Sequence, residues 1–452
     1  MRQIHLVGFL QAQNCTTIPA SWRHPEAWTN TYSPDYYQHI ARVLEAGKID
    51  SCFFDDRLAM PDMYGGDHAH TVANGIRCVK MDTVTCLMAM AAVTERLGLG
   101  ATYSTTYYEP FHVARLFQTM DLMTRGRAAW NVVTSLNDFE ALNMGREGMI
   151  AHDMRYDRAD EFMEIVHGHW DSWEDDAIVC DKTKNLYARP DKVHRLDYKG
   201  KFLASRGPFT VPRGPQGHPV IIQAGQSGRG RTFAGRWGEL IFTNYFDVAA
   251  AQPRYFEMKA TAARFGRNPD HMKIANLFYP VAAATKAEAE DKRALYDTLP
   301  KEIDQLSLLS EILSFDFARK GLDDPFTEDE IASIEGGQSW RDRVVAATGR
   351  TPTVRDFMRV TGRGTLKNPV VGGPKEIADW LEEFWSAPAC DGFVIGSTHN
   401  PGCFEDFVKF VVPELQRRGL FRKDYAGATL RDHLGLPRPP VGHWQRSVAA
   451  AD

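Results

Sequence analysis

The sequence predicts an α/β protein built on a TIM (β/α)8 barrel with insertions. Short apolar runs typical of buried strands alternate with helical patterns along most of the 452 residues. We count about eight such strand–helix units, and eight units favour closure into a barrel. A doubly wound open sheet has the same periodicity and is the alternative architecture.

The expected strands are short and mostly apolar, as buried strands of a parallel sheet usually are. They lie at 4–10, 51–55, 97–104, 127–133, 219–224, 240–243, 272–279 and 392–395. A helix begins after Ser33 with Pro34 in its first turn and ends at Gly47. The other helices expected from apolar spacing lie at 81–96, 110–123, 156–173, 228–236, 248–265, 375–384 and 404–418.

Two segments interrupt the alternation. Residues 173–217 are polar and rich in turn residues, which predicts a long loop or a small hairpin. Residues 299–370 are charged and contain no clear strand, but one more helix–strand–helix unit follows them. We therefore interpret 1–452 as a single barrel domain with an insertion at about 299–370, which we expect to act as a lid.

Composition excludes several classes of protein. The net charge is −5 and no basic stripe appears, which argues against a nucleic-acid partner. No stretch approaches the ~20 apolar residues of a membrane span, and the N-terminus does not resemble a signal peptide. Seven scattered cysteines without a CxxC pair indicate reduced thiols. We expect a cytoplasmic enzyme that neither crosses nor binds a membrane.

Polar residues follow the expected strands, where the active site of an α/β barrel lies. Apart from two aspartates, they are hydroxyl or amide side chains, a lining that suits a flat polar ligand better than a metal ion. We therefore expect no metal. The residues are Asp55, Asp56, Ser104, Thr105, Thr106, Asn131, Thr134, Ser135 and Gln223.

A glycine-rich turn at 224–230 leads from a strand into a helix. Such a turn offers backbone N–H groups to a phosphate, and Ser227 with Arg229 or Arg231 would add donors or charge. A capped helix after a tight turn explains the same residues equally well. Arg155 and Tyr156, at the start of another helix, could reach the same phosphate or form surface contacts.

Other functions fit less well. A serine hydrolase would need G-x-S-x-G, but in the motif that starts at Gly225 the fifth position is Arg229. A metal-dependent barrel hydrolase is suggested only by the pairs His68/His70 and His167/His169, without an H-E-x-x-H motif. A non-catalytic flavin-binding subunit is a third alternative. No G-x-G-x-x-G motif in the required context is present, so an NAD(P)H site is not expected.

Several segments together carry a family resemblance. They are 91–95, 104–107, 129–135, 152–162, 173–176, 223–225 and 431–435. With these segments in this order, the chain resembles the bacterial-luciferase-like FMNH2-dependent monooxygenases. The most similar subgroup includes nitrilotriacetate, dibenzothiophene-sulfone and long-chain alkane monooxygenases. The resemblance runs from about residue 4 to residue 436.

The resemblance implies an oxygenase that uses FMNH2 and O2 on a small organic substrate. FMNH2 would come from a separate NAD(P)H:flavin reductase, and the protein would be a homodimer or homotetramer. The implied flavin contacts are Asp56, Thr106, Ser135, Leu136, Tyr156, Ala224, Gly225, Gln226 and Ser227. We add Ser104 because it lies at the end of an expected strand. Leu136 replaces a histidine of the alkane enzyme, which makes the pocket more apolar.

The catalytic candidates are fewer. Asn131, together with Thr106, is expected to hydrogen-bond the edge of the isoalloxazine ring. His24 and Tyr64 are candidates for substrate contact or proton transfer. Aromatic residues near strand ends suggest an aromatic or heterocyclic substrate, with ordinary core packing as the alternative. These aromatic residues are Phe9, Phe53, Phe54, Tyr107, Tyr108 and Phe246.

Overall fold

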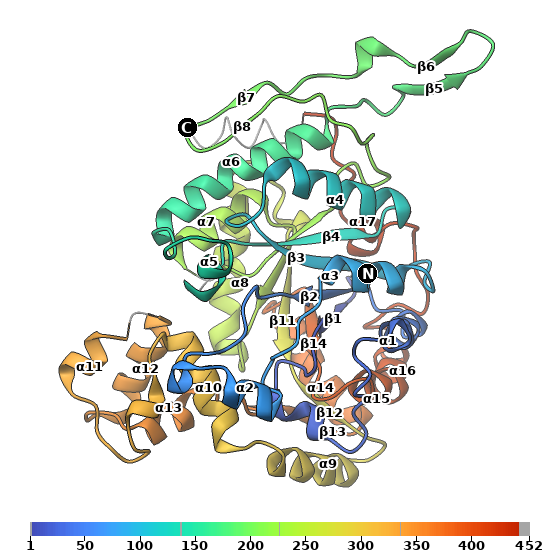
Figure 1. The fold of residues 1–452 in the computed structure, drawn as a ribbon. Helices are drawn as coiled ribbons and strands as arrows, with labels where there is room; N and C mark the ends of the chain where they lie inside the picture. The colour runs from blue at the N-terminus through green and yellow to red at the C-terminus, as the bar shows by residue number, and fades with distance from the viewer. Residues whose placement is uncertain (1, 136–137, 226, 335, 443–452) are drawn as a thin grey trace.

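Eight parallel strands close into a barrel in a computed structural model that describes residues 2–135, 138–225, 227–334 and 336–442 (Figure 1). The order around the barrel is β1-β14-β11-β10-β9-β4-β3-β2. The strands are β1 (His5–Gln11), β2 (Ser51–Asp55), β3 (Gly98–Ser104), β4 (Ala128–Val133), β9 (Val220–Gln223), β10 (Leu240–Thr243), β11 (Lys273–Phe278) and β14 (Gly392–Gly396). The predicted barrel and its eight strands are confirmed.

The first strand shows how the barrel closes. Phe9 of β1 pairs in register with Phe53 of β2 on one side and with Gly396 of β14 on the other. The rings of Phe9 and Phe53 stack inside the barrel, with centroids 4.9 Å apart. Val7 and Ile222 belong to the same interior cluster. The barrel interior is therefore a packed core rather than a pore.

Helices cover the outside of the barrel. They are α1 (Pro34–Ala46), α3 (Thr83–Ala91), α4 (Pro110–Met123), α5 (Asp138–Asn143), α6 (His152–Trp170), α7 (Gly228–Trp237), α8 (Val248–Arg264), α14 (Pro374–Ser386), α15 (Gly402–Asp406), a π-helical turn (Phe407–Val411) and α16 (Val412–Arg417). In α1, Ser33 caps the first turn by accepting the N–H of Asp35 at 3.2 Å. Its buried residues Tyr37, Ile40 and Leu44 follow helical spacing and face the barrel.

Helix α3 is shorter than predicted, ending at Ala91 instead of Arg96. The buried Arg127 guanidinium donates hydrogen bonds to the carbonyls of Thr94 and Leu97 at 3.0 and 2.9 Å. These carbonyls therefore find partners outside a helix. A tertiary contact from a residue about thirty positions later, which apolar spacing does not reveal, stops the helix.

The segment 173–217 contains two small hairpins. Of the two expectations, a long loop or a small hairpin, the structure therefore supports the hairpin. Strand β5 (Ile178–Asp181) pairs with β6 (Leu186–Ala188), and β7 (Tyr198–Lys199) with β8 (Ala204–Ser205). Figure 1 shows β5 and β6 projecting away from the barrel.

The segment 299–370 folds into helices around an apolar cluster of its own. The helices are α10 (Glu302–Leu313), α11 (Glu328–Ala332), α12 (Gln338–Thr348) and α13 (Val354–Thr361), preceded by α9 (Lys286–Thr298). Phe317, Phe326 and Phe357 are at the centre of that cluster. Figure 1 shows this helical unit beside the barrel, next to α2 (Ala69–Asn74). Strand β13 (Val370–Gly372), which was not predicted, follows the insertion and pairs with β12 (Pro280–Ala282), which precedes it.

The amino ends of the strands are sealed by the C-terminal part of the chain. In α17 (Leu430–Leu434), Leu430 and Leu434 complete the interior apolar cluster. Arg431 forms an ion pair with Glu239 at 2.8 Å. The segment 431–435, one of those that carry the family resemblance, therefore closes the end of the barrel opposite the expected active site.

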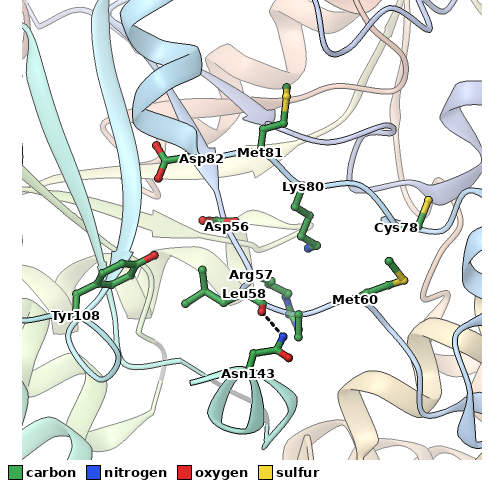
Figure 2. Close-up of a pocket in the computed structure, with 11 residues that line it drawn as sticks. Asp56, Arg57, Leu58, Met60, Cys78, Lys80, Met81, Asp82, Tyr108 and Asn143 are labelled. Carbon is green, nitrogen blue, oxygen red and sulfur yellow. Dashed lines mark hydrogen bonds between the residues drawn. The ribbon is translucent and has the colours of Figure 1, made fainter. Parts of the chain in front are cut away.

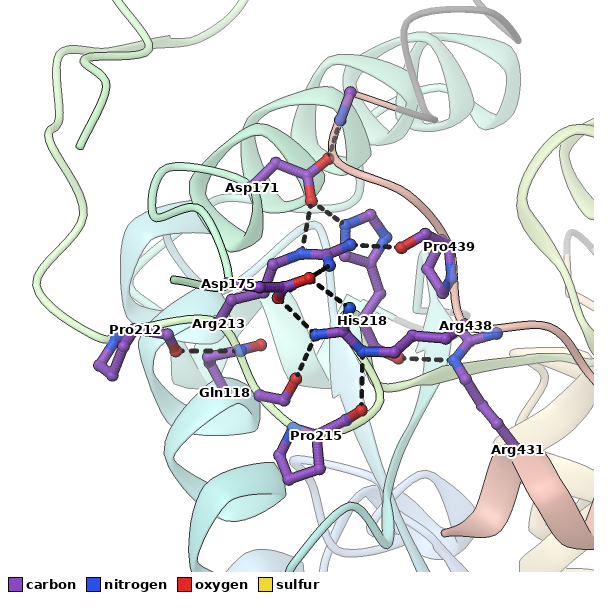
Figure 3. A network of polar contacts seen from close by, with 12 residues as sticks. Gln118, Asp171, Asp175, Pro212, Arg213, Pro215, His218, Arg431, Arg438 and Pro439 are labelled. Carbon is purple, nitrogen blue, oxygen red and sulfur yellow. Dashed lines mark hydrogen bonds and ion pairs between the residues drawn. The ribbon is translucent and has the colours of Figure 1, made fainter. Parts of the chain in front are cut away.

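A buried polar network joins the same end of the barrel to the C-terminal segment (Figure 3). Asp171 accepts hydrogen bonds from His218 at 2.7 Å and Arg213 at 3.2 Å. Burial alone would raise the pKa of Asp171, but His218 and Arg213 hold it below its ordinary value. Asp175 joins the network through Arg438 at 2.6 Å.

Two further expectations concern the whole chain. All seven cysteines carry free thiols, consistent with the absence of a disulfide framework. Within the described residues, no helix combines the length and the apolarity that crossing a bilayer requires.

Candidate active site

Hydroxyl groups from β3 and β4 meet at the carboxyl end of the barrel. Ser135 Oγ donates to Ser104 Oγ at 2.9 Å, and Ser104 Oγ also accepts the backbone N–H of Thr106 at 3.1 Å. Thr106 donates its hydroxyl to the Thr134 carbonyl at 2.8 Å. Three residues proposed from the sequence, Ser104, Thr106 and Ser135, therefore belong to one network.

The backbone bends sharply at Ser135 to reach this network. Its φ of 62° lies in the left-handed region, which costs a non-glycine residue on the order of 1 kcal/mol. Arg155 of α6 donates to the Ser135 carbonyl at 2.6 Å. The sequence suggested a phosphate as one partner for Arg155, but its guanidinium instead fixes the backbone that follows β4.

Inside the barrel, amide and carboxylate side chains lie one layer above the apolar core. Gln11, Asp55 and Asn131 each follow an interior residue by two positions, and therefore point inward. Both polar side-chain atoms of Gln11, Asp55 Oδ1 and Asn131 Oδ1 are buried without a hydrogen-bond partner among the described residues. Asn131 donates its Nδ2 to Thr102 at 2.8 Å. Buried polar atoms left unpaired are costly, so this layer suits a ligand with donors and acceptors on its edge.

The start of α7 forms a narrow cradle beside this layer. Ser227 caps the helix by accepting the N–H of Gly230 at 3.0 Å. A Cβ on Gly225 would lie 3.0 Å from the Gly230 Cα, and a Cβ on Gly230 would lie 2.9 Å from the Tyr156 hydroxyl. The two glycines therefore let the turn, Ser227 and Tyr156 pack more closely than any side chain would allow. Backbone N–H groups at a helix start favour an anion, so the residues present fit a phosphate group.

The arginines of this turn are already paired. Arg229 forms ion pairs with Asp157 and Asp160 of α6. Arg231 forms one with Glu257 at 3.0 Å. We expected one of them to add charge to the phosphate site. In the structure their guanidinium groups join α7 to neighbouring helices, which leaves the backbone, Ser227 and Tyr156 as the cradle.

A cavity of about 370 Å³ opens beside β2 (Figure 2). Asp56, Arg57, Lys80 and Tyr108 contribute polar groups to its wall, and Met60 lies among its apolar residues. Burial raises the pKa of Asp56 to about 7, although the Lys80 ammonium opposes the shift. Burial likewise lowers the pKa of Lys80 and raises that of Tyr108 to about 12.

His24 lies apart from the hydroxyl network. Its ring stacks on His399 with centroids 3.9 Å apart and on Tyr296 at 5.1 Å. His24, Glu26 and His399 offer ligand atoms within 4.8 Å of one another. The two imidazole planes differ by only 22°, so their lone pairs point side by side rather than converging on one ion. A role for His24 in substrate contact stays a prediction.

Tyr64 is half-buried in a 3-10 turn (Tyr64–Gly66) and packs against the apolar cluster of the insertion. Burial raises the pKa of its hydroxyl. Its role in proton transfer also stays a prediction. Leu136 and Gln226 lie outside the described residues.

Sequence reasoning missed several polar residues at the mouth of the barrel. Gln11 ends β1, so its strand-end position could have identified it. Arg57 follows Asp56 directly, but its partner Glu311 lies in the insertion, 254 residues away. No spacing rule connects residues so distant in sequence.

Comparison with known proteins identifies the family. Residues 17–389 match the sequence profile of the luciferase-like monooxygenases. The chain belongs to this family. It is 44% identical over 445 residues to dibenzothiophene-sulfone monooxygenase of Rhodococcus erythropolis strain XP, covering 97% of this chain and 98% of that one. This family membership makes the protein a monooxygenase, as the resemblance implied.

Two further comparisons agree. The chain is 40% identical over 428 residues to component A of nitrilotriacetate monooxygenase from Aminobacter aminovorans, covering 92% and 93% of the two chains. Its structure resembles the crystal structure of a riboflavin lyase solved with modified FMN and riboflavin. In that comparison the TM-score is 0.87 and the identity 31%, with 99% of each chain covered.

Proposed function

We propose that the protein is the oxygenase component of a two-component monooxygenase. It takes FMNH2 from a separate NAD(P)H:flavin reductase and uses O2 to oxidise a small organic substrate. The observation that carries this proposal is the placement of the α7 N-terminus, with its glycine turn, Ser227 and Tyr156, next to buried polar atoms without partners. A structural relative that contains modified FMN supports the choice of flavin.

The cradle would hold the FMN phosphate. Gly225 and Gly230 let the backbone of the turn approach closely, Ser227 and Tyr156 provide hydroxyl groups, and the α7 N-terminus offers backbone N–H groups. Ala224, which precedes Gly225, would contact the flavin through its backbone.

The ring of the flavin would lie over the barrel mouth. Ser104, Thr106 and Ser135 form one wall, and Asn131 offers an unpaired amide oxygen to the edge of the ring. Asp56, half-buried at the end of β2, lies on the neighbouring side of the mouth. Reduced FMN, when bound, supplies the electrons that activate O2. The chain itself would bind the flavin, orient the substrate and exclude water.

Water exclusion is the role we assign to the helical unit formed by 299–370. Its helix α10 is joined to the end of β2 by the ion pair between Arg57 and Glu311 at 3.2 Å. We place the enzyme in the cytoplasm as a homodimer or homotetramer, because its thiols are free and its family resemblance implies oligomers.

The experiment that tests the flavin proposal is an anaerobic fluorescence titration with FMNH2 and, separately, with oxidised FMN. We expect tight binding of FMNH2 and a large loss in the double variant Tyr156→Phe/Ser227→Ala. Because Ser227→Ala also removes a helix cap, Thr285→Ala, which removes the cap of the distant helix α9, is the matched control. Failure of the wild-type protein to bind either form would disprove the proposal.

A further inference from the structure

Four basic side chains converge on one carboxylate above the β1–β2 side of the barrel. We call them the basic cluster: Arg57, Arg77, Lys80 and Arg363. They surround Glu311 of α10, which is only 3% exposed. Burial alone would raise the pKa of Glu311, but the charges of all four basic residues hold it below its ordinary value.

One carboxylate does not pair all of these cations. Within the described ranges, only Arg57 of the basic cluster forms an ion pair within 4.0 Å, with Glu311 at 3.2 Å. Arg77 is 5% exposed, donates to the Thr17 carbonyl at 2.6 Å and keeps its Nε without a partner. Arg363 also has a buried Nε without a partner. Buried cations are costly unless an anion and hydrogen bonds compensate them.

The electrostatics of Arg363 agree with this geometry. Burial and the neighbouring guanidinium groups of Arg77 and Arg57 lower its pKa to about 9. The attraction of Glu311 does not offset these effects. Asp55 also acts on Arg57 and Lys80, and Glu140 acts on Arg57, so Glu311 is not the only negative charge near the basic cluster. The buried Nε atoms of Arg77 and Arg363 nevertheless have no partner.

Lys80 and Arg57 reach the cavity beside β2 (Figure 2). In Figure 2 the Lys80 ammonium points toward the Arg57 side of the cavity and away from Asp82. Asp82 is already occupied, since it caps α3 and accepts the Tyr103 hydroxyl at 2.6 Å. Leu58 contributes apolar surface to the same wall. The cavity thus combines the charges of Lys80 and Arg57 with apolar surface.

The basic cluster lies across the barrel from the proposed phosphate cradle. Arg57 follows β2, and the backbone of Lys80 bridges to Gln13, just past β1. The cradle follows β9, which is diametrically opposite β1 in the strand order. A flavin anchored at α7 would extend its ring toward the centre of the mouth, which leaves the basic cluster on the far, substrate side.

We propose that the basic cluster binds a carboxylate group of the substrate, so that this monooxygenase oxidises small molecules bearing carboxylates. The inference rests on the proposed function, because it assigns the far side of the mouth to the substrate. Guanidinium and ammonium groups form charge-assisted hydrogen bonds with carboxylates. The carboxylate would pair with the Lys80 ammonium at the cavity wall, the nearby charges of Arg77 and Arg363 would strengthen its binding, and the apolar wall would take the remainder of the molecule.

Calorimetric titration of the full-length protein tests this inference with a matched pair of probes. Thiodiglycolate has two carboxylates around a thioether, and its dimethyl ester keeps the same skeleton without charge. We expect the acid to bind at least about tenfold more tightly than the ester, since a charge-assisted hydrogen bond typically contributes that much. Added salt should weaken binding of the acid only.

Variants locate the binding site. Lys80→Met and Arg363→Met should each weaken thiodiglycolate about tenfold or more, while Lys80→Arg should retain most of the affinity. Lys182→Met, on the exposed β5–β6 hairpin, removes the same charge far from the barrel mouth and should change nothing. Equal binding of acid and ester, or unchanged acid binding in both folded methionine variants, would overturn the inference.

FMNH2 titration of the same samples separates the two proposals. Wild-type protein that binds FMNH2 but not thiodiglycolate refutes the carboxylate site alone. Protein that binds thiodiglycolate through Lys80 but does not bind FMNH2 retains the carboxylate site and refutes the flavin function. Circular dichroism shows whether each variant is folded.

Discussion

The hydroxyl of Ser135 donates to the hydroxyl of Ser104 at 2.9 Å and so joins the ends of two neighbouring strands. The same Ser104 oxygen accepts the backbone N–H of Thr106. A single side-chain oxygen therefore organises the chain after β3 and after β4, on the wall where we place the flavin ring.

Ser104→Ala should disturb this wall. The substitution leaves the Thr106 N–H without its acceptor, so we expect a loss of about 1–3 kcal/mol in unfolding free energy and weaker FMNH2 binding. Urea unfolding and anaerobic titration measure the two effects. Thr348→Ala, which removes a hydroxyl from the insertion, serves as the control. Unchanged FMNH2 affinity in Ser104→Ala would show that this network is not part of the flavin site.

Ser135→Gly should separate stability from binding. Glycine adopts a positive φ without strain, so stability should stay constant or rise by up to about 1 kcal/mol despite the lost hydroxyl. FMNH2 affinity should fall, because the hydroxyl and its fixed position are both lost. Cys180→Gly provides the comparison, since Cys180 also has a positive φ but lies on an exposed hairpin. Thermal unfolding and FMNH2 titration distinguish the two variants.

Asp56→Asn should change how stability depends on pH. In the folded protein burial raises the pKa of Asp56 to about 7, above its ordinary value of 3.8. The raised pKa contributes stability that is fully present below pH 3.8 and is lost as the pH rises through 7. The variant should therefore be more stable than wild type at pH 8, by at most a few kcal/mol. Urea unfolding at pH 5 and pH 8 checks this, and an identical pH dependence in both proteins would contradict it.

Leu434→Ala should destabilise the protein without touching the site. Leu434 is fully buried in the interior cluster at the amino end of the barrel, where the substitution leaves a cavity. We expect a loss of about 2–5 kcal/mol in unfolding free energy, with unchanged FMNH2 affinity at low temperature. Val441→Ala, on the exposed C-terminal segment, is the control and should cost little. A selective loss of FMNH2 affinity in folded Leu434→Ala would contradict a purely structural role.

His24 should not set the pH profile of the enzyme near neutrality. Burial lowers its pKa below the ordinary 6.5, so the imidazole is neutral at pH 7. Activity of His24→Gln, measured from pH 6 to 8 with an added flavin reductase, should keep the wild-type pH dependence. A limb of the profile that disappears in His24→Gln would instead assign proton transfer to this residue.

The placement of many candidate site residues at the barrel mouth follows from local sequence, because the geometry of a parallel barrel puts strand ends there. A residue just after a parallel strand lies at the mouth, so Ser104, Thr106 and Ser135 were identified from strand ends alone. The glycine-rich turn at Ser227 was recognised in the same way. The ion pair of Arg229 with Asp160 of another helix has no signal in the local sequence.

The alternation of short apolar runs with amphipathic helices determined parallel strands with helices between them, since burial of strand faces and helix stripes depends on spacing along the chain. The count of eight units favoured a closed barrel over an open sheet, and the tertiary structure decided between them. Only the tertiary structure decided which distant groups meet: Arg57 and Glu311, separated by 254 residues, form a buried ion pair. Arg127 ends a helix it does not belong to. Contacts of this kind arise from packing of the whole chain in three dimensions, and local spacing contains no signal for them.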